Sequence, residues 1–202
     1  MSSPDAWRAV AAKINSAFKK LDVLVNNAAM LLGKNIEDVS IEEWTQMVAV
    51  NMTSLFLGTK MYLSVLRTSG AVSKSGSSIV NISSVSGLVG APLDHLYSMT
   101  KGGATLFTKS TAVIFAKKGD RIRVNAVHPE IIDTQMGHLN VDLVARKHGD
   151  KDKDKDKDKD KDEGIKLSAE RHPLGRLGTA TDVAEAVLYL SSDASSSVTG
   201  SS

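Results

Sequence analysis

Three short runs of consecutive apolar residues predict buried β-strands, at about residues 23–26, 78–83 and 121–127. Valine and isoleucine, which favour extended backbone, recur in all three runs. Long segments with helical spacing separate the runs, so the strands should pair in parallel rather than as hairpins. The pattern therefore predicts an α/β fold, with one parallel sheet inside a three-layer αβα arrangement.

Apolar residues that recur every three or four positions predict helices around these strands. The first helix should begin at Pro4 with Ser3 as its N-cap, and the second should follow Ser40, which forms a capping box with Glu43. The expected helices cover about residues 4–18, 41–66, 97–117 and 181–190. Asn51 lies inside the second helix, where asparagine is unfavourable, and a solvent-facing side chain is the simplest explanation for it.

Three polar side chains near the second strand and the following helix point to a catalytic site. Ser84 follows the strand at the carboxyl edge of the sheet, where open α/β sheets place their chemistry. Tyr97 and Lys101 are four residues apart, so a helix places them one turn apart on one face. A cation near a phenol lowers its pKa from about 10, and a hydroxyl can hold the substrate oxygen that the phenol protonates. On these residues alone, an ordinary surface Tyr-x-x-x-Lys pair remains the alternative.

Further segments of the chain resemble the short-chain dehydrogenase/reductase (SDR) family. Ser84 lies thirteen residues before Tyr97, in the place of the family's active-site serine. The other matching segments, in the family's order, are Asn26-Asn27-Ala28-Ala29, Asn51 in its helix, Pro129-Glu130-Ile131-Ile132-Asp133-Thr134, Pro173-Leu174-Gly175-Arg176-Leu177-Gly178 and Asp182-Val183-Ala184-Glu185. The similarity covers nearly the whole chain except about residues 141–166. It is strongest toward the alcohol and hydroxysteroid dehydrogenases of the family.

The resemblance implies an NAD(P)-dependent oxidoreductase that interconverts a secondary alcohol and a ketone on a Rossmann-like, doubly wound sheet. It makes Tyr97 the general acid/base, while Lys101 lowers the tyrosine pKa and binds the nicotinamide ribose. Ser84 would hold the substrate oxygen. Asn51 would mark a backbone distortion of its helix and anchor a proton-relay water. The residues implied to contact the cofactor are Asn26, Ala28, Tyr97, Lys101, Pro129, Ile132 and Thr134. The implied cofactor is NAD or NADP, with NAD slightly favoured, and no metal site is expected.

Two departures from the family's pattern keep a second interpretation open. Glu130 stands where glycine is usual, so its side chain is expected to strain the loop or crowd the nicotinamide. The sequence also has no G-x-G-x-x-G or similar glycine-rich turn. The chain therefore resembles a single SDR-type domain, residues 1–202, that is truncated at both ends. The alternative function is a non-catalytic fragment or pseudoenzyme that retains the family's oligomerisation helices.

Composition constrains the partners and the location. The 202 residues suit one domain, the net charge is +2, and the chain has no cysteine. No signal pattern or bilayer-length apolar run is visible, so we expect a cytoplasmic protein with neither nucleic-acid nor membrane partners. The family resemblance, rather than composition, implies an alcohol or ketone substrate and a homodimer or homotetramer built on helices 41–66 and 97–117. Residues 150–162 alternate lysine and aspartate and are expected to be a disordered insert.

Overall fold

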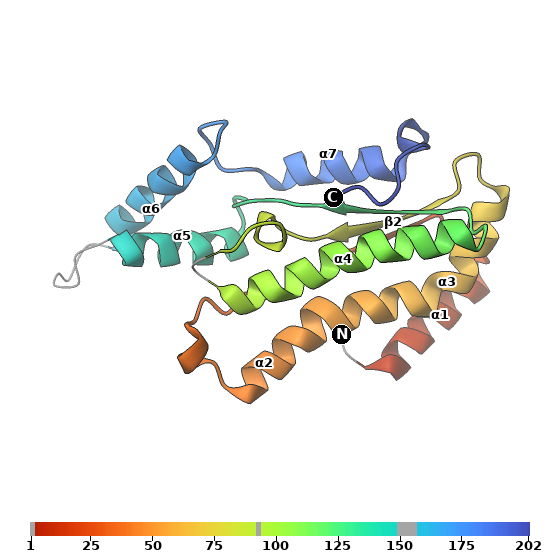
Figure 1. Ribbon diagram of the computed structural model, residues 1–202, viewed down its shortest axis with the longest axis horizontal. Coiled ribbons are helices and arrows are strands. Elements are labelled where there is room, and N and C mark those ends of the chain that lie inside the picture. The colour runs from red at the N-terminus through yellow and green to blue at the C-terminus, as the bar shows by residue number, and fades with distance from the viewer. Residues whose placement is uncertain (1–2, 92–93, 149–156) are drawn as a thin grey trace.

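A three-stranded sheet lies at the centre of the computed structural model, which describes residues 3–91, 94–148 and 157–202 (Figure 1). Its strands are β1 (Val23–Asn26), β2 (Ser77–Ile82) and β3 (Ile122–Val127), in the order β1-β2-β3. Both pairings are parallel, with Val23 opposite Ser78 and Ser77 opposite Ile122. The predicted strands are confirmed to within one residue, and so is their parallel pairing.

Helices cover both faces of this sheet and complete the predicted three layers. Figure 1 shows α7 on one side of the sheet and α1, α3 and α4 on the other. The helices are α1 (Pro4–Phe18), α2 (Ile41–Val48), α3 (Ser54–Val72), α4 (His95–Lys117), α5 (Gln135–His148), α6 (Lys157–Arg171) and α7 (Ala180–Ser191). Four shorter helical segments are η1 (Ile36–Asp38), the π-helical η2 (Ala49–Thr53), η3 (Val85–Gly87) and η4 (Asp193–Ser195).

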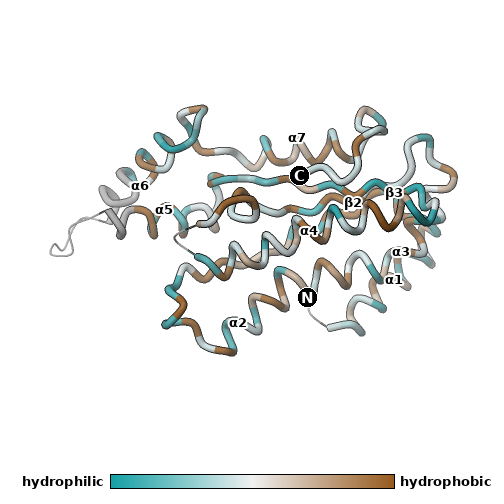
Figure 2. The backbone as a smooth tube through the Cα atoms, viewed as in Figure 1, coloured by the Kyte–Doolittle hydropathy of each residue, from teal (hydrophilic) through white to brown (hydrophobic). Residues whose placement is uncertain are grey.

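The hydrophobic core lies between the sheet and the helices α3 and α4. Leu66, Ile79 and Val124 are completely buried there, and each such side chain contributes about 1.5–3 kcal/mol of burial free energy. Trp7 of α1 meets Tyr62 of α3 edge to face, with ring centroids 5.7 Å apart. Figure 2 shows the hydrophobic stretches of β2 and β3 between α4 and α7. The core thus fixes the sheet against the helix that carries Tyr97.

The predicted second helix exists, but it is interrupted. The capping box of Ser40 and Glu43 starts α2 as expected. The five residues of η2, with Asn51 at their centre, then form a π-helical turn before α3 continues to Val72. The distortion at Asn51 is therefore present, and the helical segment extends beyond the expected end at residue 66.

Helices α5 and α6 form a pair beyond the carboxyl edge of the sheet (Figure 1). Within the lysine–aspartate run, residues 150–156 lie outside the described residues. Residues 157–162, however, form the first part of α6, so the expectation of disorder is wrong for them. Gly164 and Ser168 are buried where α6 packs on α5. This tertiary packing supplies the stability that the charged sequence does not indicate.

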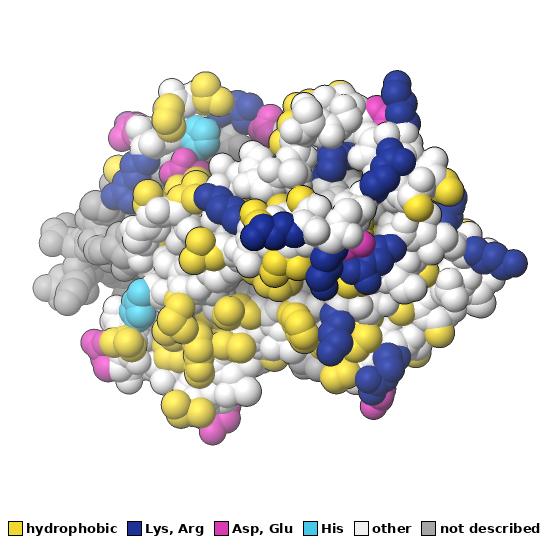
Figure 3. Space-filling view, turned by 45° about the vertical axis from the view of Figure 1, so that its right-hand side comes forward, with side chains coloured by type: hydrophobic (Ala, Val, Ile, Leu, Met, Phe, Trp, Pro, Cys, Tyr) yellow, Lys and Arg dark blue, Asp and Glu magenta, His cyan; other side chains and the backbone are white. Residues whose placement is uncertain are grey.

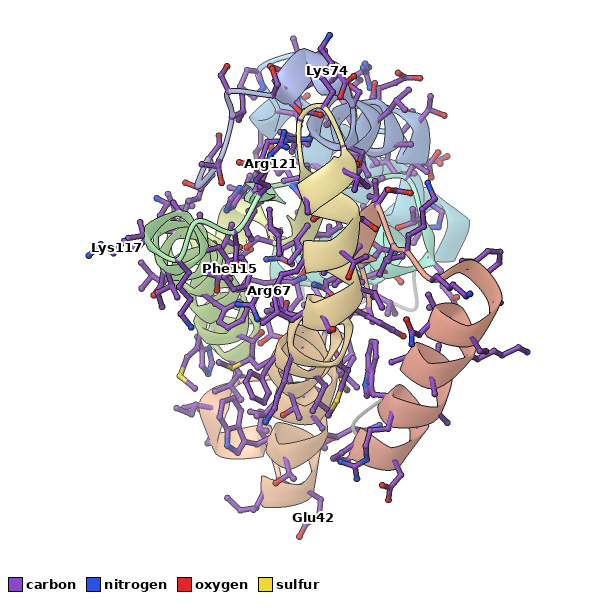
Figure 4. All side chains as sticks on the ribbon, turned by 90° about the vertical axis from the view of Figure 1, so that its right-hand side faces the viewer. Glu42, Arg67, Lys74, Phe115, Lys117 and Arg121 are labelled. Carbon is purple, nitrogen blue, oxygen red and sulfur yellow. The ribbon has the colours of Figure 1, made fainter. Side chains whose placement is uncertain are left out.

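Arginine side chains hold together the opposite, amino-terminal edge of the sheet. Arg67 donates from Nε and Nη2 to the two carboxylate oxygens of Asp120, at 2.8 Å each. Arg121 donates to the backbone oxygen of Lys74 at 2.7 Å. Figure 4 shows Arg67, Lys74 and Arg121 at this end of the molecule. These bonds join the end of α3 to the loop before β3, far from Ser84.

Candidate active site

Ser84 and Tyr97 meet at the carboxyl edge of the sheet. Ser84 directly follows the buried strand β2, and its hydroxyl accepts from the amide of Ser86 at 3.1 Å. The same hydroxyl donates to the carbonyl of Pro129 at 3.4 Å, which ties it to the loop after β3. The Ser84 side chain also acts on the phenol of Tyr97 as a hydrogen-bonding partner, in the direction that lowers the pKa of the phenol. The sheet thus positions Ser84, and helix α4 places the phenol of Tyr97 beside it.

Lys101 lies one turn deeper on the same helix. Only 2% of the residue is exposed, and its Nζ donates to the backbone oxygen of Ile82 at 2.7 Å. The same Nζ lies 5.5 Å from the centroid of the Tyr97 ring. The structure therefore brings Ser84, Tyr97 and Lys101 together, as their spacing predicted.

Burial dominates the electrostatics of this group. It raises the pKa of Tyr97 to about 12, although the hydrogen bond with Ser84 acts in the lowering direction and the charge of Asp94 adds to the rise. Burial also lowers the pKa of Lys101 to about 8. The net shift is therefore upward, because burial disfavours the phenolate, and the lowering effect expected of Lys101 stays a prediction. At neutral pH the phenol is neutral and the lysine is mainly charged.

The backbone of α4 at Lys101 is clamped against the residues around Ser84. Ser83 Oγ and Thr105 Oγ1 both donate to the carbonyl of Lys101 at 2.9 Å. Gly87 packs so closely that a Cβ there would lie 2.7 Å from the carbonyl atoms of Lys101. His128 Nε2 lies 3.0 Å from Thr105 Oγ1 and closes the network. The position of Tyr97 relative to Ser84 is thus set by backbone packing.

Asn51 lies beneath the site and does not line its cavity. Its Nδ2 donates to the carbonyl of Met30 at 2.9 Å and to Thr100 Oγ1 at 3.1 Å. Its Oδ1 accepts from the amide of Met30 at 2.8 Å. These bonds join the loop after β1 to α4. The side chain of Asn51 thus has a structural use that the sequence did not reveal.

A cavity of about 720 Å³ opens beside Ser84, Tyr97 and Lys101. Its walls come from the loops after β1 and β3, from α5 and from α7. Ala28, Pro129, Ile132 and Thr134 line it, as the family resemblance implied, whereas Asn26 does not and instead donates to Asn81 Oδ1 at 2.8 Å. The lining residues that sequence reasoning had not assigned to the site are Val25, Asn27, Ala29, Leu31, Ile82, Ser83, Ile131, Met136, Gly137, Asn140, Ala180, Val183, Ala184 and Val187.

Sequence reasoning predicted neither the cavity wall that α7 forms nor the contacts of Asp94. Val183 and Ala184 belong to a segment that matched the family, but nothing in their sequence indicates which wall they form. Asp94 stands three residues before Tyr97 at the start of a predicted helix, a visible N-cap signal. Its contacts with a segment about sixty residues earlier have no such signal.

Glu130 occupies the cavity wall without the expected backbone strain. Among non-glycine residues that the structure describes, only Lys19 has a positive φ, so Glu130 lies in ordinary backbone. Its carboxylate is 3.6 Å from His172 Nε2, in the segment between α6 and α7. The side chain therefore contacts the segment between α6 and α7, and the expectation of a strained loop is wrong, whereas crowding of the nicotinamide stays a prediction.

The sheet, its helices and the cavity at its carboxyl edge define an α/β domain of the Rossmann type. Similarity to known proteins identifies the family within this type of fold. A family model described as enoyl-(acyl carrier protein) reductase matches residues 1–202. The aldohexose dehydrogenase of Thermoplasma acidophilum superposes with a TM-score of 0.83 at 30% identity, over 99% of this chain and 72% of that one. The structure of ElxO with NADP bound gives 0.78 at 29% identity, over 99% and 71%.

Curated relatives agree with this family. The NADP-dependent (R)-specific alcohol dehydrogenase of Lentilactobacillus kefiri is 31% identical over 98% of this chain and 70% of its own length. The cyclopentanol dehydrogenase of Comamonas testosteroni is 34% identical over 100% and 70%. The 3-alpha-(or 20-beta)-hydroxysteroid dehydrogenase of Mycobacterium tuberculosis is 35% identical over 99% and 65%. The chain belongs to the short-chain dehydrogenase/reductase family of oxidoreductases, and it spans about two thirds of the length of these relatives.

Proposed function

We propose that the chain carries the catalytic half of an oxidoreductase that interconverts a secondary alcohol and a ketone with NAD or NADP. The observation that carries the proposal is that Ser84, Tyr97 and Lys101 line the same cavity, with Lys101 Nζ 5.5 Å from the centroid of the Tyr97 ring. Matched relatives named as alcohol, cyclopentanol and hydroxysteroid dehydrogenases support a secondary alcohol or ketone as the substrate. A relative named as NADP-dependent makes NADP at least as good a candidate as NAD.

The cavity suits the nicotinamide end of such a cofactor. Ala28 gives close access to the backbone after β1, Pro129 and Ile132 offer an apolar wall for a ring, and Thr134 supplies a hydroxyl. The sequence has no glycine-rich turn that could hold a pyrophosphate at a helix N-terminus. The chain's own residues therefore fit only part of a dinucleotide, and we expect weak binding by this chain alone.

The proposed chemistry assigns one task to each polar side chain. The neutral phenol of Tyr97 donates its proton to the oxygen of a ketone, and the hydroxyl of Ser84 hydrogen-bonds the same oxygen. The buried ammonium of Lys101 stabilises the phenolate that forms on the half-buried Tyr97, because opposite charges attract more strongly away from water. NAD(P)H, when bound, supplies the hydride. Asn51 would anchor a relay water through its place in the π-helical turn.

The test separates the proton-transfer role from cofactor binding. Oxidation of NADH and NADPH by a panel of cyclic and steroid ketones is followed in the wild type, Tyr97→Phe and the matched control Tyr189→Phe. Tyr97→Phe should lose a factor of about 10²–10⁴ in rate, with cofactor affinity within twofold of wild type by calorimetry, and the control should keep its rate. Full activity in Tyr97→Phe would refute the acid/base role.

A non-catalytic fragment is the second candidate, because the sequence lacks a glycine-rich turn. Calorimetric titration of the chain with NADH and NADPH distinguishes the two candidates. Micromolar binding together with ketone reduction would exclude the fragment. The absence of both, with a folded circular-dichroism spectrum, would establish it.

We also propose that the chain self-associates through α3 and α4 as a homodimer or homotetramer. Phe56 on α3 and Leu106, Val113 and Ile114 on α4 are exposed, and Figure 3 shows yellow side chains gathered on the lower part of one face. Leu106→Lys should yield a monomer in sedimentation experiments, whereas Leu174→Lys, at a similarly exposed leucine between α6 and α7, should not. A monomeric wild type at micromolar concentration would contradict the proposal.

The location of the protein stays a prediction. Within the described parts of the chain, no helix combines the length and hydropathy that a bilayer crossing needs. We expect a cytoplasmic protein, and fluorescence microscopy of a tagged chain would check this.

A further inference from the structure

Asp94 is a buried carboxylate at the start of the helix that carries Tyr97. The residue is 3% exposed. Its Oδ1 accepts from the amide of Tyr97 at 2.8 Å. Its Oδ2 accepts from the amides of Leu32 and Gly33, at 2.9 Å and 2.8 Å. One side chain therefore joins the first turn of α4 to the loop after β1.

This arrangement goes beyond a helix cap. The caps of α2 and α7 are Ser40 and Thr179, whose side chains accept from residues of their own helices. A cap needs only one acceptor oxygen. Asp94 uses one oxygen for that purpose and its second oxygen for two amides of a separate segment. Hydrogen bonds to an ionised carboxylate are stronger than those to a neutral group. Asp94 therefore holds the start of α4 firmly against the loop after β1.

The segment held by Asp94 forms part of the cavity wall. Leu31, which lines the cavity, directly precedes the two bound amides. Gly33 has a φ of 65°, and a Cβ there would lie 2.4 Å from Leu143 of α5. Residues 30–33 are thus confined between α4 and α5. A shift of Asp94 would move the phenol and this wall relative to each other.

The charge of Asp94 also acts on the phenol. Burial is the main reason for the raised pKa of Tyr97, the hydrogen bond with Ser84 opposes it, and the Asp94 carboxylate raises it further. The other charged or titratable groups around the phenol are Lys101 on the same helix and Glu130 in the loop after β3, which line the same cavity. His128 lies at the end of β3 against Thr105. Of these groups, Asp94 is tied directly to the backbone of Tyr97.

We propose that Asp94 is a positioning residue of the site: it fixes Tyr97 against residues 30–33, and its charge opposes loss of the phenolic proton. The inference rests on the proposed role of Tyr97 as the acid.

The variants Asp94→Asn and Asp94→Ser separate the two effects. Asparagine removes the charge and keeps one acceptor oxygen, whereas serine keeps a capping oxygen and is too short to serve both segments. Asp120→Asn is the matched control, because it removes a carboxylate at the opposite edge of the sheet. The readouts are ¹³C NMR titration of the labelled tyrosine rings, assigned with Tyr97→Phe, and amide hydrogen exchange at Leu32 and Gly33.

In both Asp94 variants the Tyr97 titration should move to lower pH, at pH values where circular dichroism shows a folded chain. Exchange at Gly33 and Leu32 should become about tenfold faster or more in Asp94→Ser. Asp120→Asn should change neither readout. In an active protein, kcat/KM for ketone reduction by Asp94→Asn should also decline at a lower pH than in the wild type.

An unchanged Tyr97 titration or unchanged exchange at both amides would overturn the inference. Unfolding of both Asp94 variants would also overturn it, because the residue would then serve global stability. Neither NMR readout needs a substrate or cofactor. A chain that reduces no ketone would therefore refute the proposed function while leaving the two physical effects of Asp94 measurable.

Discussion

Replacing Gly87 with alanine should disturb the packing beneath Tyr97 and Lys101. A Cβ at this position would lie 2.7 Å from the carbonyl carbon and oxygen of Lys101 and 2.8 Å from Ser83 Oγ. Carbon atoms in contact normally stay about 3.5–4.0 Å apart. The backbone of α4 would therefore have to move by about 1 Å, because backbone atoms cannot rotate away as the end of a side chain can.

The expected loss follows from two opposing effects. An extra methyl group in a close-packed site costs about 1–3 kcal/mol, while alanine restricts the unfolded chain and returns about 0.4–1 kcal/mol. Since the clash is with backbone, we expect a net loss of about 2 kcal/mol in unfolding free energy. For a chain of this length that lowers the melting temperature by about 4–8 °C. Displacing Tyr97 from Ser84 should reduce any activity by about 10²-fold.

Gly102 supplies the matched control on the same helix. A Cβ there would meet only the carbonyl oxygen of Gly87, at 3.8 Å, an ordinary contact distance. Alanine in a helix interior is more favourable than glycine by about 0.5–1 kcal/mol, so Gly102→Ala should be more stable than the wild type. Urea unfolding, followed by tryptophan fluorescence and circular dichroism, measures both. Equal stability of Gly87→Ala and wild type would refute the packing argument.

Three further substitutions probe other parts of the structure by urea unfolding. Arg123→Met should lose about 2–4 kcal/mol, because it removes 2.8 Å bonds to Leu190 O and Ser195 Oγ. Lys101→Met should gain up to about 3 kcal/mol at pH 7, since burial lowers the lysine pKa from 10.5 to about 8. That gain should shrink between about pH 8 and 10.5, where the folded lysine has lost a proton that the unfolded chain still binds. Asn51→Ala should lose about 1–3 kcal/mol and speed amide exchange at Met30. A change of opposite sign would contradict each expectation.

Local periodicity was enough to predict most of the fold. Apolar runs and capping residues specify strands and helices through interactions within a few residues, so β1 to β3 and the start of α2 were predicted closely. Tyr97 and Lys101 were expected together because four residues make one helical turn. Ser84 joins them because it ends a strand of the same sheet.

The remaining features depend on contacts between distant segments. The bonds from Asp94 to Leu32 and Gly33 join residues about sixty positions apart, and neither segment indicates the other. The direction of the Tyr97 pKa shift depends on burial, which a sequence with Lys101 one turn away does not reveal. The first turn of α6 forms from a run without apolar residues, because the following turns pack on α5.

The placement of charge along α4 suggests how the proposed acid/base group is balanced. Asp94 precedes Tyr97 by three residues and Lys101 follows it by four, so the phenol lies between a carboxylate and an ammonium that are both buried. The carboxylate opposes loss of the phenolic proton, whereas the ammonium stabilises the phenolate once it forms. In the proposed mechanism the first effect suits the acid of ketone reduction, and the second lowers the barrier for the proton to leave. The buried ammonium of Lys101 opposes folding, because burial lowers its pKa to about 8, and the site must draw stability from the core between β2, β3 and α3.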